Sequence, residues 1–315
     1  MSTAFIFPGQ GSQSVGMGKA LADAFPVARA VFDEVDAALS EKLTDIIWNG
    51  PAEALTLTEN TQPALMAVSL AAMRVLESEA GIQLSRDAAY VAGHSLGEYS
   101  ALAAAGALSL SDTARLLRIR GRAMQKAVPV GQGAMAALLG LDYATAVAVA
   151  EEAAQGDVCQ AANDNGGGQV VVSGTKAAVE RAVEIAKGKG AKRAMLLPVS
   201  APFHCRLMQP AADAMAEALA GVTINAPVVP LIANVLADAI ISPDEIRRRL
   251  VEQVTGTVRW RECVLAMSGA GVTTLYEIGS GKVLTGLAGR IDKSLKGVAV
   301  NGPADIDAAV AALVG

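Results

Sequence analysis

Residues 89–106 read AYVAGHSLGEYSALAAAG, and this stretch indicates the fold class more strongly than any other. A short apolar run enters the pattern Gly93-His94-Ser95-Leu96-Gly97, and a run rich in Ala and Leu follows it. We predict a strand at 89–92 and a helix at 98–105. A G-x-S-x-G sequence between a strand and a helix is the pattern of a nucleophile elbow, whose sharp turn exposes the serine above an α/β sheet. The pattern also fits a glycine-rich turn in which Ser95 merely caps the helix.

Outward from this stretch, apolar runs of strand length alternate with longer amphipathic segments. Such alternation is typical of a mostly parallel sheet covered by helices, an α/β core. The predicted strands of this core lie at 3–7, 89–92, 230–234, 273–278 and 297–300. The predicted helices of its first half lie at 16–39 with an interruption near Pro26, at 63–80 with Pro63 in the first turn, at 98–105 and at 111–127.

The middle third of the chain follows a different order. It predicts strands at 134–139, 158–162, 169–173 and 193–199, with helices at 143–155 and 176–187. That order is β-α-β-β-α-β, the ferredoxin-like arrangement. Gly131-Gln132-Gly133 before it and Ser200-Ala201-Pro202 after it have the composition of hinges. We therefore expect an inserted small subdomain at 129–200 and a large catalytic subdomain formed by 1–128 and 201–315.

The composition narrows the classes of function. Of 315 residues, 52% are hydrophobic, which suffices for a buried core, and the formal net charge is -5. Without a basic stripe, nucleic acid is not an expected partner. The longest apolar stretches, such as Ala101–Leu108, are too short to span a bilayer. Because Met1–Phe7 has no basic segment ahead of an apolar one, no signal peptide is predicted and the expected compartment is the cytoplasm.

Cysteine and histidine are scarce. The three cysteines, Cys159, Cys205 and Cys263, are far apart and form no C-x-x-C pair, which argues against a disulfide framework. The two histidines, His94 and His204, add too little to make a recognisable zinc site. A metal-dependent mechanism is therefore not expected, although Mg²⁺ held by carboxylates stays open.

A serine hydroxyl is a weak nucleophile and needs a base. His94 is adjacent to Ser95, and neighbours on a sharp turn usually point apart. If the base is a histidine, His204 is the better candidate by elimination. It lies in a loop just after a predicted strand, where α/β folds collect functional groups. The alternative for His204 is an ordinary surface-loop histidine, and His94 is expected to be a structural hydrogen-bonding residue.

The helix predicted at 111–127 carries an arginine in an unusual place. At about 100° per residue, Arg120 falls near the centre of the apolar face. That face is formed by Leu116, Leu117, Ile119, Ala123, Met124 and Ala127, whereas Arg115, Arg118, Arg122 and Lys126 fall on the other side. A guanidinium on an apolar face is costly unless an anion meets it. The anion is either a protein carboxylate or a substrate carboxylate held bidentately.

Two glycine-rich segments are weaker candidates. The turn Gly9-Gln10-Gly11 after the first strand is able to present backbone N–H groups to an anion. The segment 163–168, Asn-Asp-Asn-Gly-Gly-Gly, is polar and flexible. Its simplest interpretation is a hairpin connection in the small subdomain, with Asn163 kept as a candidate substrate contact.

Several motifs together resemble the malonyl-CoA:acyl carrier protein transacylase family, the acyltransferases of fatty acid and polyketide synthesis. The resemblance runs over essentially the whole chain, and the order of the motifs is more specific than G-x-S-x-G alone. The motifs are Phe7-Pro8-Gly9-Gln10-Gly11-Ser12-Gln13, Gly93-His94-Ser95-Leu96-Gly97-Glu98, Arg120-Gly121, Gln169-Val170-Val171-Val172-Ser173-Gly174, Pro198-Val199-Ser200 with His204, and Glu277-Ile278-Gly279.

The resemblance implies a fold and a set of roles. The fold is a large α/β-hydrolase-like core with an inserted ferredoxin-like subdomain. Ser95 would be the nucleophile, His204 the general base and Arg120 the anchor for the free malonyl carboxylate. The backbone N–H groups of Gln10 and Leu96 would form the oxyanion hole.

The resemblance also implies how the base is held and how the pocket is narrowed. The histidine is steadied by a backbone carbonyl, and the matching position is Gln253. The sequence departs from the family pattern beside it, where Val254 and Thr257-Val258 stand. Phe203 resembles the Phe-His pair of malonyl-selective acyltransferase domains.

The implied reaction moves malonyl from coenzyme A to the phosphopantetheine thiol of acyl carrier protein by a ping-pong mechanism through a malonyl-serine ester. No cofactor is expected beyond the thioester substrate, and a monomer is the expected state. One rival is a serine hydrolase, which would need an acidic triad member such as Asp157 or Asp164. A second rival is a non-catalytic module that binds carrier protein.

Overall fold

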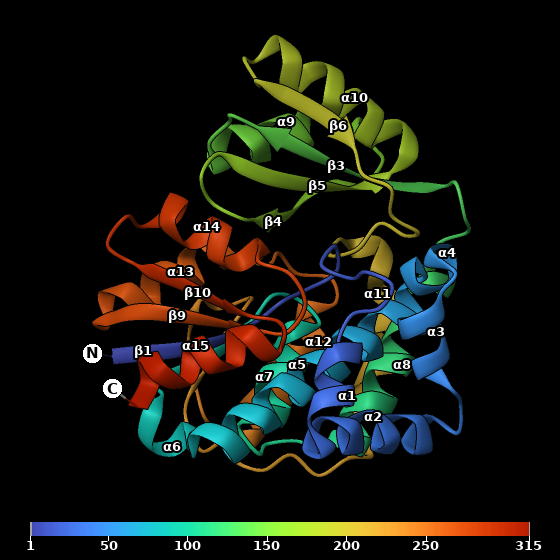
Figure 1. Cartoon of the computed structure of the whole chain (residues 1–315). Coiled ribbons are helices and arrows are strands. Elements are labelled where there is room, and N and C mark those ends of the chain that lie inside the picture. Colours follow the sequence, from blue (N-terminus) through green and yellow to red (C-terminus); the bar gives the residue numbers. More distant parts are fainter. Residues whose placement is uncertain (1, 315) are drawn as a thin grey trace.

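A six-stranded sheet forms the centre of the larger part of the molecule (Figure 1). The computed structural model describes residues 2–314. The strand order is β10-β9-β1-β2-β7-β8, and every neighbouring pair is parallel except β7 with β8. The strands are β1 (Ser2–Phe7), β2 (Tyr90–Gly93), β7 (Leu231–Ala233), β8 (Asp238–Ile240), β9 (Val272–Ile278) and β10 (Lys296–Val300). The chain thus has the mainly parallel α/β sheet that its sequence predicts.

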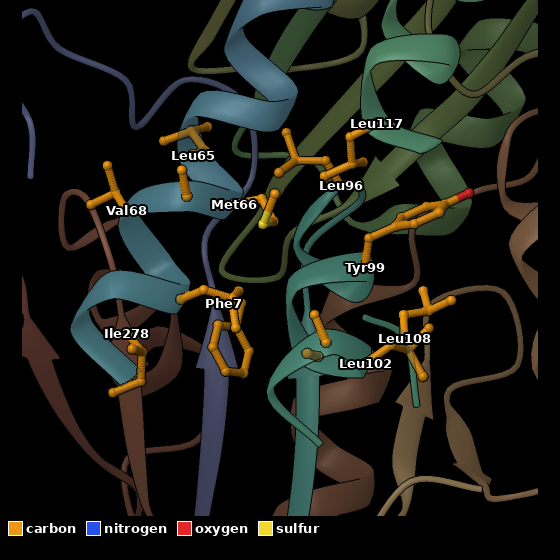
Figure 2. Packing of buried hydrophobic residues seen from close by; sticks show 14 of the residues in the cluster. Phe7, Leu65, Met66, Val68, Leu96, Tyr99, Leu102, Leu108, Leu117 and Ile278 are labelled. Atoms are coloured by element: carbon orange, nitrogen blue, oxygen red, sulfur yellow. The ribbon is translucent and has the colours of Figure 1, made fainter. Parts of the chain in front are cut away.

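Helices cover both faces of this sheet, which explains why β1 is a continuous apolar run. Phe5 and Phe7 join the cluster on one face, and Ala4 and Ile6 join the cluster on the other. The first cluster includes α5 and α7 (Figure 2), and the second includes α13 and α14. The helices of this part are α1 (Lys19–Ala24), α2 (Pro26–Leu39), α3 (Leu43–Asn49), α4 (Ala52–Thr56), α5 (Thr58–Ala80), α6 (Leu84–Asp87), α7 (Gly97–Ala104), α8 (Leu110–Ala127), α11 (Gln209–Ala220), α12 (Pro243–Gln253), α13 (Trp260–Gly269), α14 (Val283–Ile291) and α15 (Pro303–Val314), with a 3-10 turn at Arg206–Met208.

A second, antiparallel sheet of four strands lies above the first (Figure 1). Its strand order is β4-β5-β3-β6, and the elements follow the predicted order β-α-β-β-α-β. Val170 and Val172 pack with the helices of this part, whereas Val171 between them joins the main cluster. The sheet therefore has its own small core on one face and turns the other toward the main body. Its elements are β3 (Gly133–Leu139), α9 (Tyr143–Ala154), β4 (Cys159–Asp164), β5 (Gln169–Thr175), α10 (Lys176–Gly188) and β6 (Arg193–Leu196).

Helix α5 begins at Thr58, earlier than the predicted start at Pro63. A proline inside a helix has no N–H for the carbonyl four residues before it. Here the carbonyl of Glu59 accepts from Arg118 Nη1 at 2.8 Å. This contact from α8 supplies the hydrogen bond that the proline cannot make, so the helix extends past it toward the N-terminus.

The second sheet differs from the sequence prediction at two strand ends. Strand β4 continues through Asn163 and Asp164, which were expected in a loop. The connection to β5 then uses Gly166, Gly167 and Gly168, all with positive φ. Strand β6 ends at Leu196 rather than at residue 199, because Pro198 has no N–H to donate to a sheet.

Short elements escaped the sequence analysis, among them α3, α4, α6 and β8. Each is too brief to show a period of its own. No helix within residues 2–314 has both the length and the apolar character needed to cross a membrane.

Candidate active site

Ser95 lies on a tight turn between β2 and α7, with a backbone φ of 55°. Glycine is required on both sides of it. A Cβ atom on Gly93 would collide with the carbonyl of Gly97, and one on Gly97 would collide with the carbonyl of Phe7. The turn is held from outside by Asn234, whose Oδ1 accepts from the Ser95 N–H at 2.8 Å. The G-x-S-x-G pattern is therefore a strained elbow rather than a simple helix cap.

His204 reaches Ser95 from a distant loop. Its Nε2 lies 2.8 Å from Ser95 Oγ, and its Nδ1 lies 2.9 Å from the backbone oxygen of Gln253. Because a carbonyl only accepts, Nδ1 carries the proton and Nε2 accepts from the serine hydroxyl. Burial, followed by the positive charge of Arg120, lowers the pKa of His204 to about 3. The imidazole is therefore neutral near pH 7 and is able to take a proton from Ser95.

Two residues that line the cavity with Ser95 are candidates to bind an oxyanion through their backbone N–H groups. Neither the Gln10 N–H nor the Leu96 N–H donates to an acceptor within residues 2–314. Leu96 precedes the first turn of α7, where the helix dipole favours negative charge. Both residues line the same cavity as Ser95. These are the features expected of donors for an oxyanion.

Arg120 is 1% exposed, and its guanidinium donates three hydrogen bonds to uncharged side chains. Its Nη1 donates to Gln62 Oε1 at 2.7 Å, and its Nη2 donates to Gln253 Oε1 at 2.8 Å and to Ser95 Oγ at 3.2 Å. Among the described residues, no acidic oxygen lies within 4.0 Å of its guanidinium. Of the two partners that the sequence left open, a protein carboxylate in direct contact is therefore ruled out for the described part of the chain.

The helical wheel misplaced two neighbours of Arg120. Ile119 is 40% exposed, although it was assigned to the apolar face. Arg118, assigned to the polar side, is buried and pairs with Glu41 and Asn60. Helix α8 packs against α5, α11 and α2, so contacts on several sides decide burial, and one wheel does not capture them.

A cavity of about 660 Å³ brings the predicted site residues together. Besides Ser95 and His204, it is lined by Gln10, Leu96, Arg120, Asn163 and Phe203. Met135 and Val171 of the second sheet form one wall, and Val283, Leu284 and Leu287 at the start of α14 form another. Gln253 is fully buried behind the cavity and does not line it.

Within the described residues, His94 hydrogen-bonds to a loop of the second sheet and not to Ser95 or His204. Its Nε2 lies 2.9 Å from Asn165 Oδ1, and burial lowers its pKa. It supports the loop after β4, as its predicted structural role requires. Cys159, Cys205 and Cys263 are buried and free, and no three His, Cys, Asp or Glu side chains in the described chain gather as metal ligands would.

The sequence analysis missed a buried polar network behind Ser95. Glu98 is fully buried, and its Oε2 accepts from the Asn234 N–H at 2.8 Å and from Gln253 Nε2 at 3.2 Å. Gln253 Nε2 also donates to the Ser95 carbonyl at 2.9 Å. Burial raises the pKa of Glu98 to about 7. The only signal in the sequence was an acidic residue directly after the elbow, which reads as an ordinary first-turn residue of a helix.

An elbow serine bonded to a buried neutral histidine, with free N–H groups beside it, defines the class of α/β proteins with a Ser–His pair. Within that class, a family model described as acyl transferase domain matches residues 4–301. The chain belongs to this family.

Relatives in the family share nearly the full length of the chain. Malonyl CoA-acyl carrier protein transacylase of Escherichia coli (strain K12) is 49% identical over 307 residues, 98% of each chain. The protein of the same name from Bacillus subtilis (strain 168) is 47% identical over 311 residues, 98% of this chain and 96% of the relative.

The chain is also similar to solved structures of proteins with the same kind of name. Acyl-carrier-protein-S-malonyltransferase of Bartonella henselae is 61% identical, covers 100% of both chains and superposes with a TM-score of 0.98. A malonyl-transacylase solved in complex with a type II PKS acyl-carrier protein is 44% identical, with 99% and 100% of the two chains covered and a TM-score of 0.95.

Proposed function

We propose that this protein transfers a malonyl group from coenzyme A to the phosphopantetheine thiol of acyl carrier protein, through an ester on Ser95. The observation that carries the proposal is the buried Arg120 guanidinium, which has no carboxylate within 4.0 Å among residues 2–314 and whose Nη2 lies 3.2 Å from Ser95 Oγ. A diacid acyl group would bring that partner, because its free carboxylate is able to pair bidentately with Arg120. The names of the relatives support the same donor and acceptor.

In the first half-reaction, His204 Nε2 takes the hydroxyl proton while Ser95 Oγ attacks the thioester carbon. The oxygen of the tetrahedral intermediate accepts from the N–H groups of Gln10 and Leu96. The carbon–sulfur bond then breaks, and the departing thiolate of coenzyme A takes the proton from His204. The Gln253 carbonyl keeps the imidazole in the required tautomer throughout.

In the second half-reaction, His204 takes the proton of the phosphopantetheine thiol, and the sulfur attacks the malonyl ester. The bond to Ser95 Oγ breaks, and the proton returns from His204 to the serine. Atoms and charges balance without any other reagent, so no cofactor enters the proposal. The product is malonyl-acyl carrier protein for fatty acid or polyketide synthesis.

We also propose that the chain forms two subdomains. Segments 1–128 and 201–315 would form an α/β-hydrolase-like catalytic subdomain, and 129–200 a ferredoxin-like one. The strand order of the second sheet and its two helices on one face support this division. The two segments that connect 129–200 to the rest of the chain lie side by side, since a Cβ atom on Gly133 would collide with Pro202.

Two lining residues would contact the substrate. Asn163, at the end of β4, is buried and offers an amide to the cavity. Phe203 precedes the base and would narrow the space beside the reacting carbon. A single extra methyl group in such a pocket is worth about 1–3 kcal/mol of discrimination.

Intact mass after brief exposure to malonyl-CoA tests the proposal. The wild type should gain one malonyl group, and the Ser95→Ala variant should gain none while keeping its fold. Addition of holo acyl carrier protein should remove the adduct and yield malonyl-carrier protein. An adduct that water discharges as fast as the carrier protein does would indicate a hydrolase, and a protein that binds carrier protein without ever gaining mass would be a binding module.

A further inference from the structure

Three hydrogen bonds connect Arg120 to Gln10 across the cavity wall. Arg120 Nη1 donates to Gln62 Oε1 at 2.7 Å, and Gln62 Nε2 donates to Thr58 Oγ1 at 2.8 Å. The Thr58 hydroxyl then donates to Gln10 Oε1 at 2.9 Å. Thr58 is fully buried and Gln62 nearly so, so water does not compete for these groups. The residues at the two ends of this chain of bonds, Arg120 and Gln10, line the same cavity as Ser95.

The direction of every bond in this chain follows from Arg120. A guanidinium has only donors, so the Gln62 oxygen must face it and the Gln62 nitrogen must face Thr58. The Thr58 oxygen accepts that bond, so its single hydrogen points to Gln10. All donors therefore point the same way, and bonds aligned in this manner strengthen one another in a low-dielectric interior. Thr58 is the one link that both accepts and donates through a single atom.

The backbone beneath the chain is fixed as well. Thr58 and Gln62 lie in the first turns of α5, which pack directly on α8 beside Arg120. A Cβ atom on Gly121 would lie 2.5 Å from Glu59 Cα and 2.7 Å from the Thr58 carbonyl. Only glycine allows this approach, so the first turn of α5 packs directly on the backbone of α8 next to Arg120. The hydrogen-bonded chain therefore has a rigid support at its middle.

We propose that the Thr58 hydroxyl is a positioning group that fixes Arg120, through Gln62, relative to the Gln10 turn, and thereby favours acyl groups that carry a carboxylate. The inference rests on the proposed function, in which Arg120 holds the carboxylate and the Gln10 N–H holds the thioester oxygen. Loss of the Thr58 hydroxyl should disturb the position of Arg120 more than that of the Gln10 N–H. At Arg120 the connection runs through the Gln62 side chain, which loses its hydrogen bond to Thr58, whereas the Gln10 N–H belongs to the backbone of the turn.

The test compares Thr58→Val with wild type, using malonyl-CoA and acetyl-CoA as donors to acyl carrier protein. Valine keeps the shape and removes the hydroxyl, which leaves Gln62 Nε2 with only the Met124 sulfur, at 3.6 Å, as an acceptor. We expect kcat/KM for malonyl-CoA to fall about tenfold, the value of one buried hydrogen bond, and kcat/KM for acetyl-CoA to change less than about twofold. Thr58→Ser, which restores the hydroxyl, should return the malonyl-to-acetyl ratio to within about twofold of wild type.

Thr61→Val is the matched control. Thr61 is also fully buried in the first turns of α5, but its hydroxyl donates to the Leu55 carbonyl at 2.5 Å and takes no part in the chain. It should lower the melting temperature without changing the ratio between donors. If Thr58→Val does not fold, Thr58→Ala removes the same hydroxyl with less crowding.

The outcomes separate the two proposals. Wild type that forms no malonyl ester overturns the proposed function and this inference with it. Active wild type with an unchanged donor ratio in Thr58→Val, or an equal loss for both donors, overturns the inference alone. In an Arg120→Ala background, Thr58→Val should have no further effect on malonyl transfer, and additive losses would also overturn it.

Discussion

The two sheets contribute to the cavity in different ways. The main sheet and the segments around it supply the reacting groups, and each of these is held by a residue distant in the sequence: Ser95 by Asn234, and His204 by Gln253. The second sheet supplies wall residues, both apolar (Met135, Val171) and polar (Asn163, Gln169), and within residues 2–314 none of these hydrogen-bonds to Ser95 or His204. Groups that react must be held within fractions of an ångström, whereas a wall only has to exclude. Substitutions in the main body should therefore lower the rate of acyl transfer, and substitutions in the second sheet should mainly change how tightly the substrate binds.

The largest effect is expected at His204, because it is the group that moves the proton. His204→Ala should slow acylation of Ser95 by about 10²–10⁴-fold, the range for a positioned general base. Rapid mixing with malonyl-CoA and quenching for mass analysis measures this rate. His94→Ala is the control, and a loss there as large as at His204 would mean that the roles of the two histidines are exchanged.

The next effect is expected at Arg120. Arg120→Ala should lower kcat/KM for malonyl-CoA by about 10²–10³-fold, because the substrate carboxylate would be buried without a partner. Acetyl transfer should be spared, and Arg120→Lys should not restore malonyl transfer, because a point charge lacks the planar fork. Arg118→Ala, on the same helix, should cost stability without changing the donor ratio. Equal losses for both donors in Arg120→Ala would show that Arg120 is structural.

A smaller effect concerns pH and the network behind the elbow. The pKa of Glu98 is raised from 4.5 to about 7 by burial, so the folded protein binds this proton more tightly than the unfolded chain does. Stability from Glu98 is then full below about pH 4.5 and is lost as the pH rises toward 7, by an amount on the order of a few kcal/mol. Denaturant unfolding of wild type and Glu98→Gln between pH 4.5 and 8 measures it, and the variant should show a flatter profile. Parallel profiles would contradict the assignment.

The smallest effect is expected in the second sheet. Val171→Ala enlarges the cavity wall without touching a reacting group, so KM for malonyl-CoA should rise by less than about tenfold with kcat nearly unchanged. Val172→Ala is the control, since Val172 faces the small core under α9 and α10. It should lower stability and leave KM as it is. A large loss of kcat in Val171→Ala would remove the distinction between the two sheets.

Features that depend on contiguous residues were predicted correctly from the sequence. The elbow was predictable because its two glycines, its strand and its helix are contiguous, and each glycine is required by a close contact. Burial of Arg120 was predictable because helical periodicity places it among apolar neighbours. The β-α-β-β-α-β order was predictable from the alternation of short and long periodic runs.

Long-range contacts were not predictable in the same way. The network of Glu98, Asn234 and Gln253 joins residues far apart in the chain, and nothing local marks them as neighbours. The start of α5 was missed because Pro63 is visible in the local sequence, whereas the compensating donor is not. That donor is Arg118 of α8, whose Nη1 donates to the Glu59 carbonyl that Pro63 leaves without an N–H. The burial of Arg118 was missed for the same reason: its partners come from α5 and from Glu41.

Gln253 contacts the site through two chemically independent parts. Its side chain holds Arg120 and the elbow, while its backbone oxygen holds His204. In a saturation library at position 253, most variants should therefore lose the side-chain contact with Arg120 and keep the backbone contact with His204. An alanine scan would report only half of what the residue does. The backbone oxygen that supports His204 is placed by the end of α12 and does not depend on the side chain at that position. For this reason the departures from the family pattern at Val254 and Thr257 leave the His204 contact in place.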